Sequence, residues 1–534
     1  MDLSTTIHLL GETLGDVLRT QESVALFEVE ERIRTLAKTR RGGDPAAGAR
    51  LAAEVARLPD DGARVTASAF AVYFDLVNLA EEAHRIAALR ERERARHPAP
   101  SAESIREAVG LLAQRGVTPA QMSALLGTLR VELVLTAHPT EAKRRTVLSK
   151  LQRIAETLHR LGDPGLLPRE REAATLSLRA EVATLWLTDR ARTARPAVTD
   201  EVRTGLYFVD AIFWDALPRI AADLEGALRE HYPTLAAPPG WLGLASWIGG
   251  DRDGNSSVTA AVTAETLRLH RGLAVERHRR SLQELARRVS VSGRRCPPPP
   301  LLAAWLETRR PLPARMAYLE QRYANAPYRL VLSLLAADLE AASEDDMTAR
   351  LLEDTQHRAR VTTDELRLVL DLVADAVPAA LTDDGLRRVR RQLEIFGLQA
   401  ARLDLREDSG RLAATVGRML AALGSITDFE QGDDAQRTVF LLSLLKDDPP
   451  AAATLTAAAG AHEASDETWR LFRLLARAGA CMAKNRSAPS SSRWPMAPPT
   501  SSPSSCWRAG RGAHPGSPSP RSSRRWTTST APRE

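Results

Sequence analysis

Apolar residues recur every three or four positions along most of the chain, the spacing that places them on one face of an α-helix. Residues 65–95 show the pattern most clearly and end in a charged turn. The same spacing predicts further helices over 12–40, 103–129, 169–190, 200–230, 262–289, 363–376 and 467–479. Stretches typical of connections separate them, at 42–46, 233–240, 296–300 and 447–450. The pattern therefore predicts a mostly helical protein.

Three short apolar runs interrupt the helices, and each leads through a polar turn into another helix. The first, VELVLTA, stops at His138 and Pro139. Thr140 is placed to cap the helix that follows. The apolar face of that helix is predicted from its spacing of three and four, at Val147, Leu151, Ile154, Leu158 and Leu161. This is the order of a strand, a turn and a helix.

The other two runs have the same form. WLGLASWI gives way to GGDRDGN, residues 249–255, and then to a helix. In the third run, Leu403 and Leu405 flank Asp404 and the strand leaves at Arg406, with Ser409 predicted to cap the next helix. Because catalytic groups project from the carboxyl ends of parallel strands, these three turns are the candidate functional positions.

His138, Arg252 and Arg406 each lie near such a strand end. One imidazole that titrates near neutrality and two guanidiniums together suit an anionic substrate that carries phosphate or carboxylate. Each residue also has a purely structural interpretation. His138 fits a buried turn histidine bonded to the backbone, GGDRDGN fits a turn rich in Asx and Gly, and Arg406 fits a surface ion pair with Asp404 or Glu407.

Composition restricts the class of protein. The chain has 534 residues, which at roughly 150 residues per domain allows three or four domains. With 44% hydrophobic and 26% charged residues, disordered and collagen-like classes are excluded. Apolar runs are too short to span a membrane, the N-terminus lacks a secretory pattern, and the three cysteines lie far apart. We expect a reduced, cytoplasmic protein without a membrane span.

The net charge of +6 comes from one segment. Residues 481–534 hold nine of the 73 Lys and Arg but one of the 67 Asp and Glu, so the preceding 480 residues carry about −2. This tail has thirteen Ser and nine Pro but no Val, Ile, Leu or Phe. Such a composition predicts disorder. A basic arm of this kind can bind nucleic acid, but the nearly neutral remainder argues against a nucleic-acid partner.

The amino-acid sequences of the three turns resemble those of a known family. TAHPTEAKRRTVL, SWIGGDRDGN and LDLRED are similar to the signatures of phosphoenolpyruvate carboxylase, in that family's order. The resemblance extends over roughly residues 8 to 480 and includes LLGETLGDVLR, FDLVNLAEEAHR and FWDALP. One departure is Glu407-Asp408 after LDLR, where the family usually has Gln followed by Asn or Glu. More acidic surroundings are therefore expected for Arg406.

The resemblance implies an α/β, mostly helical fold, in which part of a TIM-type β/α barrel is surrounded by many extra α-helices. It also implies a cytoplasmic homotetramer that uses Mg²⁺ or Mn²⁺ to form oxaloacetate and phosphate from phosphoenolpyruvate and bicarbonate. His138 matches the catalytic histidine that promotes release of CO₂ from carboxyphosphate. Arg406 matches a ligand of the substrate phosphate, and Arg252 is assigned a supporting role in substrate binding.

No metal ligand is expected in this chain, because the family's metal-binding carboxylates lie in a C-terminal half that has no counterpart here. Residues 1–480 are therefore interpreted as the N-terminal part of a carboxylase, inactive by itself. The alternative is a non-catalytic helical protein, an assembly or regulatory partner that retains the fold.

The tail, 481–534, is interpreted as translated in a shifted reading frame. The chain has five Lys against 68 Arg, which indicates a GC-rich gene. We assigned plausible codons to residues 489–496 and 521–530 and read them in a frame shifted by one base. The first segment then encodes VVISMAD and the second encodes LFETVDDLD. Both resemble the family sequence that follows the part matched by residues 8 to 480. Trp526 has one codon, ending in G, and Thr527 begins with AC, so one Asp of VDD is forced. Loss of one base near codon 480 accounts for this.

Overall fold

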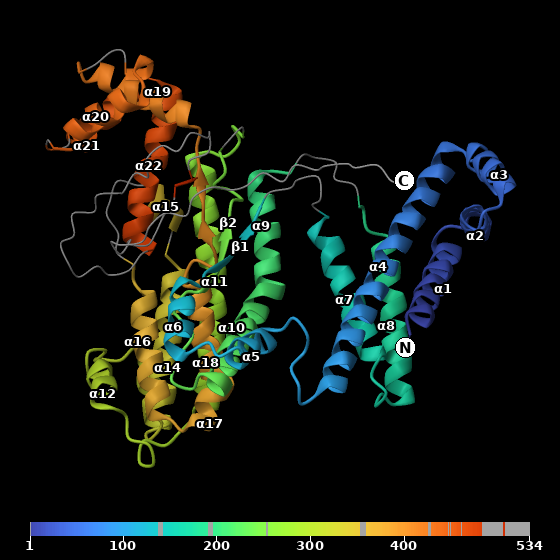
Figure 1. Cartoon of the computed structure of the whole chain (residues 1–534), viewed down its shortest axis with the longest axis horizontal. Coiled ribbons are helices and arrows are strands. Elements are labelled where there is room, and N and C mark those ends of the chain that lie inside the picture. Colours follow the sequence, from blue (N-terminus) through green and yellow to red (C-terminus); the bar gives the residue numbers. More distant parts are fainter. Residues whose placement is uncertain are drawn as a thin grey trace.

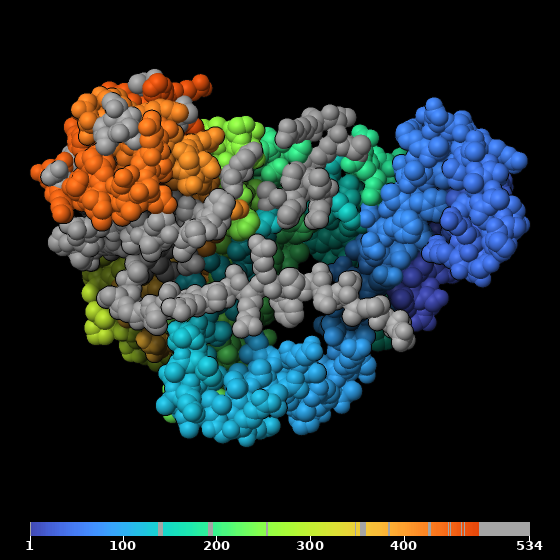
Figure 2. Space-filling view, turned by 45° about the horizontal axis from the view of Figure 1, so that its top comes forward, coloured from blue at the N-terminus to red at the C-terminus, as the bar shows by residue number. Residues whose placement is uncertain are grey.

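The structure is a computed structural model that describes residues 2–136, 143–190, 196–252, 255–345, 347–352, 359–425, 429–446, 448, 450–460, 462–482 and 506–507. Helices make up most of it, with short strands near the middle (Figure 1). In the space-filling view, the helices from the N-terminal 100 residues form one end of the molecule and those after residue 408 form the other (Figure 2).

Six N-terminal helices form one packed group. They are α1 (Leu3–Gln21), α2 (Val24–Arg41), α3 (Pro45–Ala56), α4 (Asp60–Arg96), α7 (Arg145–Leu161) and α8 (Pro168–Trp186). A common core joins α1, α4, α7 and α8. The five apolar positions predicted for α7 are all buried in this core, which confirms that helix face: Val147, Leu151, Ile154, Leu158 and Leu161.

A small parallel sheet lies at the centre of the fold. It contains β1 (Val131–Leu135), β2 (Leu242–Ser246) and β3 (Arg402–Leu403) in that order. Val131 pairs with Leu242 and Leu135 with Ser246, so β1 and β2 end together. Each strand comes from one of the three apolar runs, which confirms the strands predicted there. The structure therefore has the mostly helical α/β fold that was expected. The described residues form no closed barrel.

The helices around the sheet contribute two larger cores and one small one. They are α5 (Ile105–Gln114), α6 (Pro119–Thr128), α9 (Val198–Phe208), η1 (Val209–Phe213), α10 (Trp214–His231), α11 (Ala260–Arg288), α12 (Pro300–Glu307), α13 (Ala314–Arg322), α14 (Pro327–Ser343), α16 (Thr363–Ala376), α17 (Ala379–Leu381), η2 (Thr382–Leu386) and α18 (Arg387–Phe396). The long helix α11 packs on α14, and Trp214 of α10 stacks on Phe396 of α18 with ring centroids 4.5 Å apart. These contacts fix the helices on either side of β2 and β3.

The remaining elements lie beyond the carboxyl ends of the strands. They are α15 (Met347–Leu352), β4 (Leu405–Arg406), α19 (Ser409–Ala422), η3 (Phe429–Gln431), α20 (Asp434–Leu444), α21 (Ala452–Gly460), α22 (Glu463–Met482) and β5 (Cys506–Trp507), which pairs antiparallel with β4. Leu403 and Leu405 join α11, α15 and α22 in a further core. In the described part of the chain, no helix is both long and apolar enough to cross a membrane.

Three local predictions were wrong. The helix predicted over 103–129 is two helices, α5 and α6, because Thr118 and Gln121 form a capping box that starts α6. The helix predicted over 12–40 is two helices, because the Ser23 side chain accepts a hydrogen bond from the Leu26 amide at 3.1 Å and starts α2. The cap predicted at Ser409 is Asp408, whose carboxylate accepts from the Arg411 amide at 2.8 Å. Asp and Ser are both good N-caps, and here the residue one position earlier takes the role. The cap predicted at Thr140 lies outside the described residues.

Candidate functional site

The loop after β2 is held against the segment that follows β3 by backbone hydrogen bonds. The Asp404 amide donates to the Ser246 carbonyl at 2.9 Å, and the Arg406 amide donates to the Gly250 carbonyl at 3.0 Å. The Arg252 amide in turn donates to the Arg406 carbonyl at 2.9 Å. The parallel pairing of β2 with β3 therefore continues past both strands, and it brings Arg252 and Arg406 together at the carboxyl edge of the sheet.

Two glycines permit this close approach. A Cβ atom on Gly250 would lie 2.3 Å from the Asp404 carbonyl oxygen, a distance that no side chain tolerates. Gly249 has a φ of +82°, and a Cβ there would lie 2.1 Å from Oγ1 of Thr266 on α11. The first glycine of the GGDR sequence thus suits a left-handed turn against a helix, and the second suits backbone contact with the neighbouring strand.

The guanidinium of Arg406 lies at the surface of this edge. Its side chain is 22% exposed, its Nη1 donates to Asp251 at 3.3 Å, and its Cζ is 4.6 Å from the centre of the Trp247 ring. The ion pair that the sequence left open, with Asp404 or Glu407, is not the one found, because those carboxylates have other partners. Arg406 is therefore supported from one side by an aromatic ring and remains partly open to solvent.

Arg252 has a different environment, since its side chain is only 2% exposed. Its Nε lies 3.0 Å from Glu407, itself buried, and its Nη2 lies 3.4 Å from Glu467 on α22. Glu467 also accepts a hydrogen bond from the Ala260 amide at the start of α11, at 2.6 Å. Among the residues that the structure describes, Nη1 of Arg252 is buried without a hydrogen-bond partner. Arg252 therefore ties the loop to two helices.

A second, partly buried ion-pair group supports the strands. Arg402 on β3 makes a two-pronged contact with Glu132 of β1 at 2.9 and 2.7 Å, and it also pairs with Asp404. Burial disfavours the charge on Arg402, but the two carboxylates outweigh this and raise its pKa above the usual value. The Trp247 indole donates to Asp404 at 3.2 Å, so this group also orients the ring under Arg406.

His138, the predicted catalytic residue, lies outside the described residues. The strand before it ends at Leu135, which pairs with Ser246 at the same edge as the Arg252 loop. After it, Lys143 is held by Asp75 of α4 at 2.6 Å and Arg144 donates to the Asp189 carbonyl at 2.7 Å. Both ends of the His138 segment are thus anchored by described residues.

Two described histidines on α11 do not belong to the site. His270 and His278 are fully buried, and burial lowers the pKa of each to about 4, so both are neutral at pH 7. Nδ1 of His270 lies 3.5 Å from the Ala401 carbonyl and Nε2 of His278 lies 2.9 Å from the Gly397 carbonyl, which makes them links between α11 and the chain leading to β3.

The sequence did not indicate four of the site's residues: Trp247, Asp251, Glu407 as a partner of Arg252, and Glu467. Asp251 directly follows the glycine pair and Trp247 lies two positions before it, so closeness to GG was an available signal. Glu467 lies 215 positions after Arg252 in an ordinary amphipathic helix, which carries no such signal. Over the described ranges, no three His, Cys, Asp or Glu side chains gather so that they could hold a metal ion.

Comparison with known proteins identifies the family. The family model of phosphoenolpyruvate carboxylase matches residues 3–486. The phosphoenolpyruvate carboxylase of Roseiflexus castenholzii is 36% identical over 452 residues, 82% of this chain and 48% of that protein. The corresponding protein of Thermus thermophilus is 36% identical over 456 residues, 83% and 48% respectively. That of Pseudomonas aeruginosa PAO1 is 33% identical over 453 residues, 84% and 49%.

The chain spans about half the length of the curated relatives it matches. The three turns described above all lie within the matched residues. By the extent of the family match and its agreement with the resemblance of the three turns, the chain belongs to the phosphoenolpyruvate carboxylase family.

Proposed function

We propose that the complete protein forms oxaloacetate and phosphate from phosphoenolpyruvate and bicarbonate. The observation that carries the proposal is the placement of Arg252 and Arg406 side by side at the carboxyl edge of a parallel sheet, within a chain of this family. Both substrates are anions, and they repel each other when they meet. Positive charge at that edge reduces the repulsion, and an exposed guanidinium there can hold phosphate in a defined orientation.

In this proposal Arg406 binds the phosphate of phosphoenolpyruvate. Its partial exposure and its support by Trp247 and Asp251 favour this role, because a preoriented guanidinium loses little freedom when it binds. Asp251 is an exchangeable partner at 3.3 Å, a long contact that a phosphate oxygen can replace.

Arg252 acts indirectly in this scheme. Its buried pairing with Glu407 and Glu467 holds the GGDR loop on the strand that carries Arg406, so it positions the phosphate ligand. The buried Nη1 atom leaves one further donor at this edge. Glu407, the acidic departure from the family pattern, faces Arg252 and Arg411, and Asp408 caps α19. Neither carboxylate forms an ion pair with Arg406 among the contacts described.

We propose His138 as the catalytic residue. Bicarbonate attacks the phosphorus, giving carboxyphosphate and the enolate of pyruvate. His138 then takes the proton of carboxyphosphate, CO₂ leaves, and the enolate captures it. An imidazole suits this step because its pKa lies close to working pH. The parallel register of β1 and β2 supports the placement, since residue 138 follows Leu135 by three positions.

The three-stranded sheet is, in this proposal, part of a TIM-type barrel that the remainder of the complete protein closes. Parallel strands are normally covered on both faces. In β1, however, Val131, Leu133 and Val134 are 38 to 40% exposed. By resemblance we further propose a cytoplasmic homotetramer and a Mg²⁺ or Mn²⁺ ion that stabilises the enolate oxygen when bound. The described residues offer no ligand set for that ion, so none of them is assigned to it.

The test uses the full-length protein with His138→Asn. We expect loss of oxaloacetate formation with phosphoenolpyruvate binding retained, because the imidazole acts after both substrates are bound. His159→Asn, on the described helix α7, is the matched control and should retain activity. Near-normal carboxylation by His138→Asn removes this residue from the mechanism. If the folded wild-type protein binds no phosphoenolpyruvate, the proposed enzymatic function is wrong. That result would favour a non-catalytic helical protein that acts as an assembly or regulatory partner.

A further inference from the structure

Trp247 directly follows β2, and its backbone is fixed on both sides. The Trp247 amide donates to the Leu135 carbonyl at the end of β1 at 2.8 Å. The Trp247 carbonyl accepts from the Gly250 and Asp251 amides, both at 2.9 Å. These bonds hold the Cα atom of Trp247 at the carboxyl edge of the sheet. They do not set the plane of the indole, because the side chain can still rotate about its own torsions.

The contact that sets this plane comes from the segment between β3 and β4. The indole N–H of Trp247 donates to Oδ2 of Asp404 at 3.2 Å. The Asp404 side chain is only 10% exposed, so little water competes for this hydrogen bond. Because the indole N–H is the only polar group on a tryptophan side chain, a single bond to it is enough to select one orientation of the ring.

The carboxylate of Asp404 is itself held in place. Nη2 of Arg402 lies 3.3 Å from Oδ2 of Asp404, the oxygen that accepts the indole N–H, and the two side chains form an ion pair. The same guanidinium makes its two-pronged contact with Glu132 on β1. The Asp404 amide also donates to the Ser246 carbonyl at 2.9 Å. The acceptor for the indole is therefore fixed through both its backbone and its side chain.

The ring in turn supports Arg406. Cζ of Arg406 lies 4.6 Å from the centre of the Trp247 ring, within the range of cation–π attraction. The contact of Arg406 with Asp251 is long for a hydrogen bond, at 3.3 Å. An arginine side chain has many rotamers, and ordering it costs free energy when a ligand binds unless the protein has ordered it beforehand. The fixed indole supplies that order.

We propose that Asp404 is a positioning residue for the phosphate of phosphoenolpyruvate and acts through Trp247 on Arg406. This inference rests on the proposed function, in which Arg406 binds that phosphate. Without the acceptor on Asp404 the indole rotates, and Arg406 is ordered only when the substrate arrives. Binding of phosphoenolpyruvate is then weaker, whereas the chemistry of the bound substrate is retained, so the loss falls on KM.

The experiment is steady-state kinetics of the full-length protein with phosphoenolpyruvate as the varied substrate. Trp247→Phe keeps a ring but removes the N–H, and Asp404→Ala removes the acceptor. Each should raise KM for phosphoenolpyruvate about three- to tenfold and leave kcat within about twofold of wild type. The double variant should raise KM no more than the larger single effect, because both changes remove the same contact.

Two further variants separate positioning from a general loss of stability. Asp404→Asn keeps an oxygen that accepts the indole N–H but weakens the ion pair with Arg402, so it should lower the urea midpoint and leave KM close to wild type. Trp186→Phe is the matched control, since the Trp186 indole donates to Glu22 at 3.1 Å in the N-terminal helices. It removes the same kind of bond and should leave KM unchanged.

An unchanged KM in Trp247→Phe overturns the proposal, and so do single effects on KM that multiply in the double variant. Arg406→Ala distinguishes this failure from failure of the proposed function. If Arg406→Ala raises KM and Trp247→Phe does not, only the positioning role is wrong. If neither raises KM, Arg406 is not the phosphate ligand. Should Asp404→Ala fail to fold, Trp247→Phe decides, because it leaves the ion pairs of Asp404 and Arg402 intact.

Discussion

Nε of Arg252 lies 3.0 Å from Oε2 of Glu407, and both side chains are almost fully buried. The pair joins the loop after β2 to the segment after β4, two parts of the chain that are 155 positions apart. It also lies one residue from Arg406 on the same stretch of backbone. The orientation of Arg406, the residue proposed to bind phosphate, therefore depends on a buried ion pair.

Glu407→Ala should destabilise the fold by about 3 kcal/mol, because it leaves the buried Arg252 with Glu467 as its remaining carboxylate. Glu407→Gln, which keeps an acceptor oxygen and the side-chain shape, should lose less than half of that. Urea unfolding measures both. Asp434→Asn changes a carboxylate that is 74% exposed and serves as the control. If Glu407→Ala unfolds at the same urea concentration as the control, the pair does not hold the loop.

Arg406→Ala should weaken phosphoenolpyruvate binding by about ten- to a hundredfold, because a charge-assisted contact contributes roughly 1.5–3 kcal/mol. In the full-length enzyme this change appears mainly in KM. Arg280→Ala, on the exposed side of α11, is the control. An unchanged KM for phosphoenolpyruvate would show that Arg406 only pairs with Asp251.

Gly250→Ala should destabilise the protein by about 1–3 kcal/mol, because the new Cβ collides with the Asp404 carbonyl and must push β4 away. Gly272→Ala in α11 is the matched change, since its Cβ meets nothing within 4 Å, and it should stabilise the helix by about 0.5–1 kcal/mol. Thermal unfolding of the two variants should move in opposite directions. A Gly250→Ala variant as stable as Gly272→Ala contradicts the close backbone contact.

Stability should fall as the pH drops from about 6.5 to about 4, owing to His270 and His278. Burial lowers the folded-state pKa of both from 6.5 to about 4, so the unfolded chain takes up protons first as pH falls. The free energy of unfolding is not reduced by these histidines above pH 6.5. Between pH 6.5 and about 4 it falls by up to about 3 kcal/mol for each histidine.

Urea midpoints at pH 7.5 and 5 measure this dependence. His278→Gln should reduce the difference between the two midpoints, whereas His84→Gln, an exposed change on α4, should not. If His278→Gln leaves the difference intact, that histidine is not held neutral by the fold.

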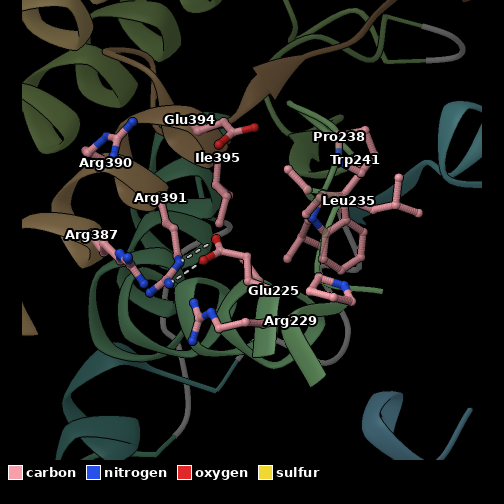
Figure 3. A pocket seen from close by; sticks show the side chains of 15 residues that line it. Glu225, Arg229, Leu235, Pro238, Trp241, Arg387, Arg390, Arg391, Glu394 and Ile395 are labelled. Atoms are coloured by element: carbon pink, nitrogen blue, oxygen red, sulfur yellow. Dashed lines mark hydrogen bonds and ion pairs between the residues drawn. The ribbon is translucent and has the colours of Figure 1, made fainter. Parts of the chain in front are cut away.

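Local order was largely predictable from the sequence. The three apolar runs became β1, β2 and β3–β4, and the apolar spacing of α7 located its buried face, because both features depend on neighbouring residues alone. The contact between Arg252 and Glu467 was not predictable, since 215 positions separate the two and Glu467 lies in an ordinary amphipathic helix. The contact between Arg391 and Glu225 shows the same limit, because it forms only when α18 packs on α10 (Figure 3).

That residues 481–534 are translated in a shifted reading frame is a separate proposal. The absence of Val, Ile, Leu and Phe from residues 481–534 favours an out-of-frame segment. Sequencing the gene should reveal an open frame, displaced by one base, that continues past codon 534 and encodes the carboxylase sequence that follows. Early stop codons in that frame would show that the tail is genuine.

We propose that residues 1–480 are the N-terminal part of a working phosphoenolpyruvate carboxylase. The most direct measurement is bicarbonate-dependent oxaloacetate formation by the protein expressed from the gene with the displaced frame restored near codon 480. Oxaloacetate and phosphate should form in equal amounts, with activity that depends on His138 and Arg406. A folded full-length protein that forms no oxaloacetate from phosphoenolpyruvate and bicarbonate would contradict it.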